Sequence, residues 1–321
     1  MEILDIRSRG LASFDACSGD WSSPFSGLPG FSAEAHRRRL RGLVSKALES
    51  AESVALAAQD GGGVIGFAAC EPNAWESAFF GRRMFGLTAF RAGSPDAART
   101  LLRELLSRAS WDTVTAKADP LDLGALHALE QAGFRLMDTN LMCAFQTSPQ
   151  CLEIQAKEGL DVSPARTEDL EAVKAITRNS FKGYRSRFTD DSRLPAAARS
   201  SFYEVWAENS MNGFANLVLV ARFDGRPAGY ITAIRNAEAE SLVGCAVGQV
   251  GLAGVDPAFQ GRGLYETLQR HALKWACEQG MQFVLYVTHL GNRAVQRRLC
   301  TLGYFPLASR HSLHLHRENL P

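Results

Sequence analysis

The sequence predicts an α/β fold built from two similar units in tandem, and two observations lead to this prediction. Each half contains a hairpin turn between two apolar strands, at Asp60–Gly63 and at Phe223–Pro227. Each half also contains a helix that ends in Leu-x-x-x-Gly-aromatic, at Leu129–Phe134 and at Leu299–Tyr304, so that the two glycines lie 170 residues apart. Self-similarity of this kind is typical of a duplicated architecture.

The length also favours two domains, because a chain of 321 residues is longer than most single domains. We expect residues 1–150 to form the first unit and residues 151–321 to form the second, with a linker at 146–160. Each half is long enough to bury a substantial core of its own.

Composition and charge narrow the classes of function. The 35 basic and 34 acidic residues leave no net field, and the densest basic cluster, His36–Arg41, is short, so we expect no nucleic-acid partner. No apolar run approaches the ~20 residues that cross a bilayer, and Met1–Gly10 lacks the apolar core of a signal peptide. Seven cysteines without CxxC pairing indicate reduced thiols rather than disulfides or a metal site. We therefore expect a cytoplasmic protein with no metal and no membrane partner.

A glycine-rich bend in the second half is the most informative segment for function. An apolar strand, Val250–Val255, leads through a turn into Gln260–Gly263, and an amphipathic helix follows. This order directs backbone N–H groups at an anion, because glycine allows close approach and a helix N-terminus carries partial positive charge. A nucleoside-triphosphate loop would need a Lys after its second glycine, and a dinucleotide loop would need a third glycine. The bend therefore predicts another phosphate ligand or, as the simpler alternative, a capped helix after a tight turn.

The spacing Gln-x-x-Gly-x-(Gly/Ala), placed at Gln260–Tyr265, resembles the pyrophosphate loop of the GCN5-related N-acetyltransferases. Asn292, Gly303 and Tyr304 match a second pattern of that family, N-x-x-A-x-x-x-Y-x-x-x-G-F, and the resemblance covers about residues 160–316. It implies that each tandem α/β (α+β) unit has a mixed, mostly antiparallel sheet flanked by helices. It also implies acetyl-CoA, or another acyl-CoA, as co-substrate, and direct attack of a small-molecule primary amine on the thioester.

The resemblance also implies the residues of a cofactor site. The strand end would offer backbone groups to the pantetheine arm, the bend would hold the pyrophosphate, and Asn292 would bond the pantetheine or the acetyl end. The residues implied in cofactor binding are Ala253, Gly254, Val255, Gln260, Gly261, Arg262, Gly263, Leu264, Tyr265, Asn292 and Arg298.

Two positions depart from the family pattern. Leu299 stands where the family has the Tyr that protonates the departing thiolate, and Tyr265 stands where the loop has Gly or Ala. The catalytic candidates are then His289, at the end of the following strand, and the phenol of Tyr304. Tyr286 and Tyr265 are further sources of a phenol. A structural role is the alternative for each of these side chains.

The first half lacks the phosphate loop. Its corresponding helix, Ser94–Arg108, starts with Ser-Pro-Asp, which is an ordinary capped start, so we expect this unit to be degenerate in cofactor binding. Its segment Trp75–Arg82 nevertheless resembles the dTDP-fucosamine acetyltransferase family, which acetylates the amine of a nucleotide-linked amino sugar. The region of Arg187 and Tyr203 lines the acceptor site in that family, which implies substrate binding by these two residues.

Three alternatives stand beside an acetyltransferase for nucleotide-linked amino sugars. An enzyme similar to mycothiol synthase would acetylate a cysteinyl amino sugar instead. A non-catalytic acyl-CoA-binding or sensor protein would account for the two departures from the pattern. A tRNA-dependent peptidyl ligase would need a basic channel, which the balanced charge disfavours. The sequence is compatible with a homodimer and does not determine the oligomeric state.

Overall fold

The computed structural model describes residues 1–17, 19, 21–148, 154 and 157–319. Its contacts divide the chain into two compact units. Unit 1 comprises Met1–Ser26, Ser32–Asn140 and Ser309–Pro321, and unit 2 comprises Gly27–Phe31 and Leu141–Ala308. The expected boundary at 150/151 and part of the expected linker at 146–160 lie outside the described residues.

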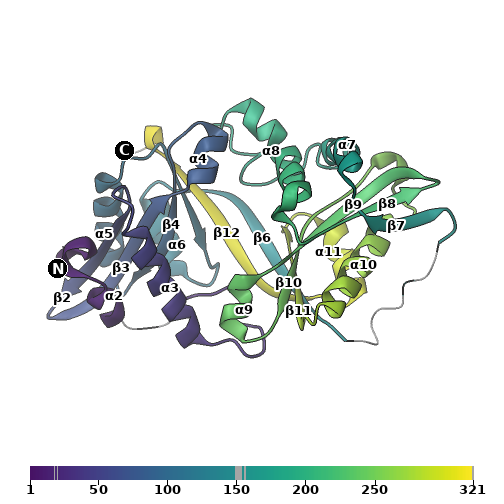
Figure 1. Cartoon of the computed structure of the whole chain (residues 1–321). Coiled ribbons are helices and arrows are strands. Elements are labelled where there is room, and N and C mark those ends of the chain that lie inside the picture. Colours follow the sequence, from purple (N-terminus) through teal and green to yellow (C-terminus); the bar gives the residue numbers. More distant parts are fainter. Residues whose placement is uncertain (18, 20, 149–153, 155–156, 320–321) are drawn as a thin grey trace. The chain divides into compact units, whose positions relative to one another are not determined.

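Unit 1 is built around one β-sheet (Figure 1). Its strands are β1 (Glu2–Asp5), β2 (Val54–Asp60), β3 (Gly63–Pro72), β4 (Met84–Ala92), β5 (Thr113–Ala118) and the C-terminal part of β12 (Phe305–His316). Its helices are α1 (Ile6–Arg9), α2 (Ala12–Ala16), α3 (Ala33–Ala47), α4 (Ala74–Phe80), α5 (Pro95–Arg108) and α6 (Leu123–Gln131). The strand order is β1-β2-β3-β4-β5-β12, and all neighbours pair antiparallel except β4 and β5, which are parallel.

Unit 2 repeats this plan. Its strands are the C-terminal part of β6 (Arg135–Gln146), β7 (Leu160–Pro164), β8 (Leu217–Phe223), β9 (Arg226–Arg235), β10 (Val247–Val255) and β11 (Phe283–His289). Its helices are α7 (Leu170–Ser180), α8 (Ala196–Asn209), α9 (Ala237–Val243), α10 (Leu264–Glu278) and α11 (Arg293–Leu302), with short turns η2 (Thr167–Asp169), η3 (Ser210–Phe214) and η4 (Pro257–Phe259). The strand order is β6-β11-β10-β9-β8-β7; β10 and β11 are parallel, while β7 to β10 pair antiparallel.

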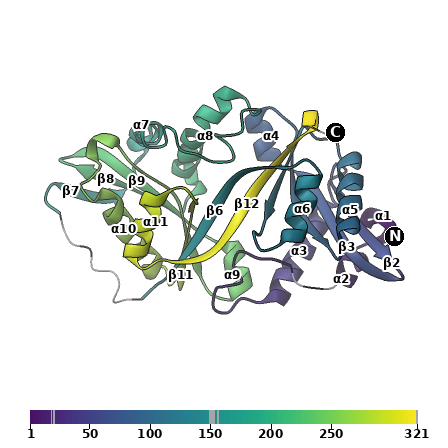
Figure 2. The ribbon, with the colours of Figure 1, turned by 180° about the vertical axis from the view of Figure 1, so that it is seen from behind.

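The fold class predicted from the sequence is confirmed, because each unit has a mixed, mostly antiparallel sheet flanked by helices. In unit 2, Leu268 of α10 and Leu299 of α11 belong to a core cluster on one face of the sheet. Val173 of α7 belongs to a separate cluster on the other face, and Figure 2 shows α7 apart from α10 and α11. Among the described helices, none combines the length and the apolar character that a membrane crossing requires.

The two units exchange their last strands. His311–His316 of β12 pair antiparallel with β5 in unit 1, and Leu315 is fully buried in the unit 1 core with Trp111. Phe145 of β6 is buried in the unit 2 core, where its ring lies 5.4 Å from that of Tyr304. The units therefore differ from the expected ranges 1–150 and 151–321 by these exchanged segments and by Gly27–Phe31, which belong to unit 2.

We predict that Leu315→Ala destabilises unit 1 by about 2–5 kcal/mol, because it leaves a cavity in a core that the rest of the first half encloses. Hydrogen exchange should report the change as faster exchange of the β5 amides, Thr113–Ala118. The matched control is Leu136→Ala, since Leu136 is 55% exposed. Equal exchange of β5 in both variants would contradict a structural role of the exchanged strand.

Candidate active site

Strands β10 and β11 diverge partway along their length. Their parallel ladder ends at the pair Val250–Tyr286, although β10 continues to Val255 and β11 to His289. The register between β10 and β9 shifts between Val250 and Ala253, which marks a β-bulge at the same point. Beyond the bulge, β10 still pairs with β9 on one edge, while its ladder to β11 has ended. The three strand residues implied in cofactor binding lie on this segment.

The bulge is held by Thr232 of β9. The Thr232 hydroxyl accepts a hydrogen bond from the Leu252 backbone N–H at 2.8 Å, and a Cβ on Gly251 would lie 2.6 Å from the same oxygen. Residues two apart on a regular strand share a face, yet Val250 packs in the α10 and α11 cluster and Leu252 in the α7 and α8 cluster. The extra residue therefore changes the alternation of side chains along β10, so that Val250 faces α10 and α11 while Leu252 faces α7 and α8.

The segment Asp256–Gly263 turns the chain from β10 into α10. The Asp256 carboxylate accepts hydrogen bonds from the Ala258 N–H at 3.0 Å and from Asn179 Nδ2 at 2.9 Å, which fixes the start of the turn. Gly261 and Gly263 have φ angles of 77° and 76°, in the left-handed region that glycine adopts without strain. These two glycines therefore set the path of the loop.

The N-terminus of α10 has no side-chain cap, since its N-cap residue is Gly263. The backbone N–H groups of its first turn therefore have no acceptor within the helix. At the corresponding end of α5 in unit 1, Ser94 Oγ accepts from the Ala97 N–H at 3.2 Å, and Pro95 has no N–H to offer. The geometry thus leaves an anion site open at α10 and closes it at α5.

The remaining loop residues have different surroundings. Gln260 and Arg262 are exposed, and the Arg262 guanidinium lies 4.8 Å from the centroid of the Phe223 ring. Leu264 is buried in the unit 2 core, so it anchors the start of α10. Tyr265 turns inward, and its hydroxyl accepts a hydrogen bond from Gln269 Nε2 at 3.2 Å. The larger side chain at the Gly/Ala position of the pattern therefore packs into the protein rather than across the loop.

Charged side chains surround the helix end. Lys157 Nζ donates to the Gly263 carbonyl oxygen at 3.3 Å. Glu266, in the first turn of α10, would oppose an anion, but Arg270 at 3.0 Å and Arg298 at 3.8 Å offset its charge. Arg298 is thus brought to the loop through an ion pair with Glu266.

His289 has a defined ring orientation at the end of β11. Its Nδ1 accepts a hydrogen bond from the Gly291 backbone N–H at 2.9 Å, so the proton of the neutral ring is on Nε2. In this state Nε2 can donate a hydrogen bond but cannot take a proton. The geometry therefore favours His289 as a donor rather than as a general base.

Asn292 caps the helix that follows. Its Oδ1 accepts from the Val295 N–H at 3.4 Å, at the N-terminus of α11. The carboxamide oxygen is used in this cap, so the amide N–H group is the part of Asn292 that a cofactor could engage.

Leu299 and Tyr304 both belong to the unit 2 core. Leu299 is 0% exposed, and the Tyr304 ring is 4% exposed. The Tyr304 hydroxyl donates to Gln269 Oε1 at 3.5 Å, and burial raises the pKa of this phenol well above its usual range. Gln269 is fully buried and was not singled out from the sequence. Gln269 could be found in the sequence because it is a polar residue on the apolar face of α10, beside the core residues Leu268 and Ala272.

The two residues implied in acceptor binding join one aromatic cluster after α7. The Arg187 guanidinium lies 3.9 Å from the Phe188 ring centroid, and Phe188 stacks on Phe202 at 3.9 Å. Phe202 in turn contacts the Tyr203 ring at 5.2 Å. The cluster begins next to the open end of β10, because a Cβ on Gly254 would lie 2.6 Å from Ser180 Oγ, at the end of α7.

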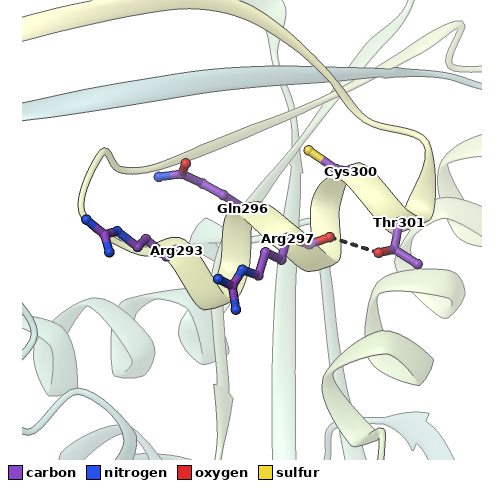
Figure 3. Close-up of a pocket in the computed structure, with 5 residues that line it drawn as sticks. All are labelled: Arg293, Gln296, Arg297, Cys300 and Thr301. Carbon is purple, nitrogen blue, oxygen red and sulfur yellow. Dashed lines mark hydrogen bonds between the residues drawn. The ribbon is translucent and has the colours of Figure 1, made fainter.

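A separate depression of about 600 Å³ lies on the outward face of α11 (Figure 3). It is lined by Arg293, Gln296, Arg297, Cys300 and Thr301. The buried residues Leu299 and Leu302 lie on the opposite face of the helix, and Arg298 is on the side toward Glu266. The depression therefore points away from the loop and is not part of the candidate site.

Comparison with known proteins agrees with the fold and the duplication. Residues 182–304 match the model of the acetyltransferase (GNAT) family. The solved structure of a tandem GNAT protein from the clavulanic acid biosynthesis pathway has a TM-score of 0.55 and 13% identity, and the match covers 98% of each chain. At this identity the likeness concerns the fold alone.

Two curated relatives span most of the chain. The dTDP-fucosamine acetyltransferase of Escherichia coli O6:H1 is 28% identical over 238 residues, which cover 74% of this chain and 93% of the relative. The spore coat polysaccharide biosynthesis protein SpsD of Bacillus subtilis is 21% identical over 248 residues, which cover 76% of this chain and 82% of the relative.

Proposed function

We propose that this chain, whose residues 182–304 match the acetyltransferase (GNAT) family model and which is 28% identical to a known acetyltransferase, transfers an acetyl group from acetyl-CoA to the primary amine of an amino sugar. A nucleotide-linked amino sugar is the preferred acceptor. The observation that carries this proposal is the open, uncapped N-terminus of α10 beside the free edge of β10.

The loop before α10 fits a pyrophosphate. Two glycines with positive φ let the backbone approach the ligand, and the first-turn N–H groups face it with the partial positive charge of the helix end. Arg262 and Lys157 add positive charge at the same place, and Arg298 offsets Glu266.

The free edge of β10 fits the pantetheine arm. An amide-containing chain can pair with Ala253–Val255 as an added strand, because the ladder to β11 ends before them. A backbone N–H of this edge would polarise the thioester carbonyl and stabilise the oxyanion that forms when the amine attacks. His289 Nε2–H and the amide of Asn292 supply further donors at the end of β11.

The aromatic cluster after α7 fits an acceptor with a ring and a phosphate. Tyr203 offers a ring face to a sugar or a base, and Arg187 offers a guanidinium to a phosphate. Support for the acceptor class comes from the two relatives, one named for dTDP-fucosamine and one for a coat polysaccharide.

The direct test is thiol release from acetyl-CoA in the presence of a panel of acceptor amines. We expect release with TDP-linked amino sugars and weaker release with the free sugars, because the free sugars lack the phosphate for Arg187. A cysteinyl amino sugar in the same panel tests the mycothiol-synthase-like alternative. Acetyl-CoA binding without thiol release on any amine would contradict the proposed reaction.

We predict that Gly263→Glu abolishes CoA binding, because a carboxylate would face the pyrophosphate. The matched control is Gly263→Gln, which carries the same backbone strain at φ 76° without the charge. Isothermal titration should give a Kd for the Glu variant at least about tenfold above that of the Gln variant, since like charges at close range are costly. Equal Kd values for the two variants would remove the pyrophosphate from this loop.

We predict that His289→Ala lowers kcat by about 10²-fold, with a much smaller change in CoA affinity, if the Nε2 proton stabilises the reacting thioester. His289→Asn separates this role from a structural one, because the Asn carboxamide oxygen can accept the Gly291 N–H in place of Nδ1. The Asn variant should be as slow as the Ala variant. Wild-type turnover in His289→Asn would mean that the ring only shapes the turn.

A further inference from the structure

Three tyrosines and one glutamine form a buried polar cluster inside the apolar core of unit 2. Gln269 is 0% exposed, Tyr304 4% and Tyr286 6%, and Tyr265 completes the cluster. The surrounding residues, such as Leu268 and Leu299, are apolar. Buried hydroxyl and amide groups are retained in such a core only when they are hydrogen-bonded to one another.

The hydrogen bonds of this cluster run in one direction. The Tyr304 hydroxyl can only donate to the carbonyl oxygen of Gln269, at 3.5 Å. The Gln269 amide nitrogen can only donate to the Tyr265 oxygen, at 3.2 Å. The Tyr265 hydroxyl can then donate its proton to the Tyr286 oxygen. Burial is the main cause that raises the pKa of Tyr265, and the hydrogen bond to Tyr286 raises it further.

Tyr286 is the last member of this series of hydrogen bonds, and the series does not use the proton of the Tyr286 hydroxyl. Its backbone pairs with Val250, at the last rung before β10 and β11 diverge. The Tyr286 ring lies 6.3 Å from the Tyr304 ring. Tyr184 belongs to the aromatic cluster after α7, where its ring lies 5.4 Å from that of Tyr203, and its charge contributes to the raised pKa of Tyr286. The open end of the line therefore stands between the pantetheine edge and the acceptor region.

We propose that the Tyr286 hydroxyl donates a hydrogen bond to the departing sulfur of CoA and takes over the stabilising role that Leu299 cannot perform. Tyr265, Gln269 and Tyr304 act through Tyr286 as positioning residues. This inference rests on the proposed function, because it requires acyl-CoA in the divergence of β10 and β11.

The reaction balances with Tyr286 as a donor that keeps its proton. The amine nitrogen forms the new C–N bond, the C–S bond breaks with its electron pair going to sulfur, and the nitrogen releases one proton to solvent. Burial raises the pKa of Tyr286 to about 12, whereas a thiol ionises near 8.5. The phenol therefore remains protonated beside the thiolate and stabilises it by a charge-assisted hydrogen bond.

The test measures the ionisation of bound CoA, so it needs no acceptor amine. Protein saturated with CoA is titrated with pH, and the thiolate is followed by its ultraviolet absorbance relative to CoA-free protein. Donation to sulfur should make the ionisation constant of bound CoA about tenfold larger in the wild type than in Tyr286→Phe, which is about one pKa unit. Tyr265→Phe should give a smaller change in the same direction, because it removes only the bond that orients Tyr286.

Tyr230→Phe is the matched control. Tyr230 is also a buried tyrosine of unit 2, and its hydroxyl accepts from Thr177 Oγ1 at 2.8 Å on the α7 side of the sheet. Its loss should leave the titration of bound CoA unchanged. Identical titrations in the wild type and Tyr286→Phe would overturn the inference while leaving CoA binding, and hence the proposed function, intact. A wild type that does not bind CoA would overturn both.

Discussion

The hydrogen bond from the Leu252 N–H to the Thr232 hydroxyl keeps one extra residue in β10, and the geometry of the site follows from that residue. Without it, β10 would continue its ladder with β11 past Val250, and Leu252 would share a face with Val250. The insertion ends the ladder, turns Leu252 toward α7 and leaves a strand edge with unused backbone groups. Each proposed contact to a thioester depends on that free edge.

Unit 1 contains the same β-bulge and the same early end of the parallel ladder, but its corresponding helix, α5, begins differently. The β3–β4 register shifts between Ala69 and Cys70, and the parallel pairing of β4 with β5 ends at Gly86. The helix that follows, α5, is capped by a serine and begins with a proline. Its first-turn backbone N–H is therefore bonded to the side chain of Ser94 rather than left open to a ligand. The two units therefore differ in whether this helix N-terminus is capped, while their sheets remain alike.

The sequence predicts the architecture well, because hairpin turns, the repeated Leu-x-x-x-Gly-aromatic ending and the glycine-rich bend are local signals. It also predicts the loop that leaves α10 uncapped. It does not predict the exchanged strands, since Leu141–Phe145 and Ser312–His316 have similar apolar patterns and either sheet could accept either strand. Nor does it predict the line from Tyr304 to Tyr286, because this line joins residues from a helix, a strand and a turn through hydrogen bonds that no spacing encodes. The direction of the His289 ring likewise depends on the Gly291 N–H, which is a feature of the turn.

The exchanged strands determine the order in which the sheet of unit 1 can be completed during synthesis. During synthesis, the strands of unit 1 from β1 to β5 leave the ribosome long before β12, which pairs with β5 through His311–His316. The first half of the nascent chain therefore carries an open sheet edge until His311–His316 have been made, and such edges readily pair with other chains. The first domain of a chain commonly folds first during translation, but here the sheet of unit 1 is complete only after the strands of unit 2 have been made. The edge of β5 that pairs with β12 therefore has no partner from this chain throughout the interval between the synthesis of the two strands.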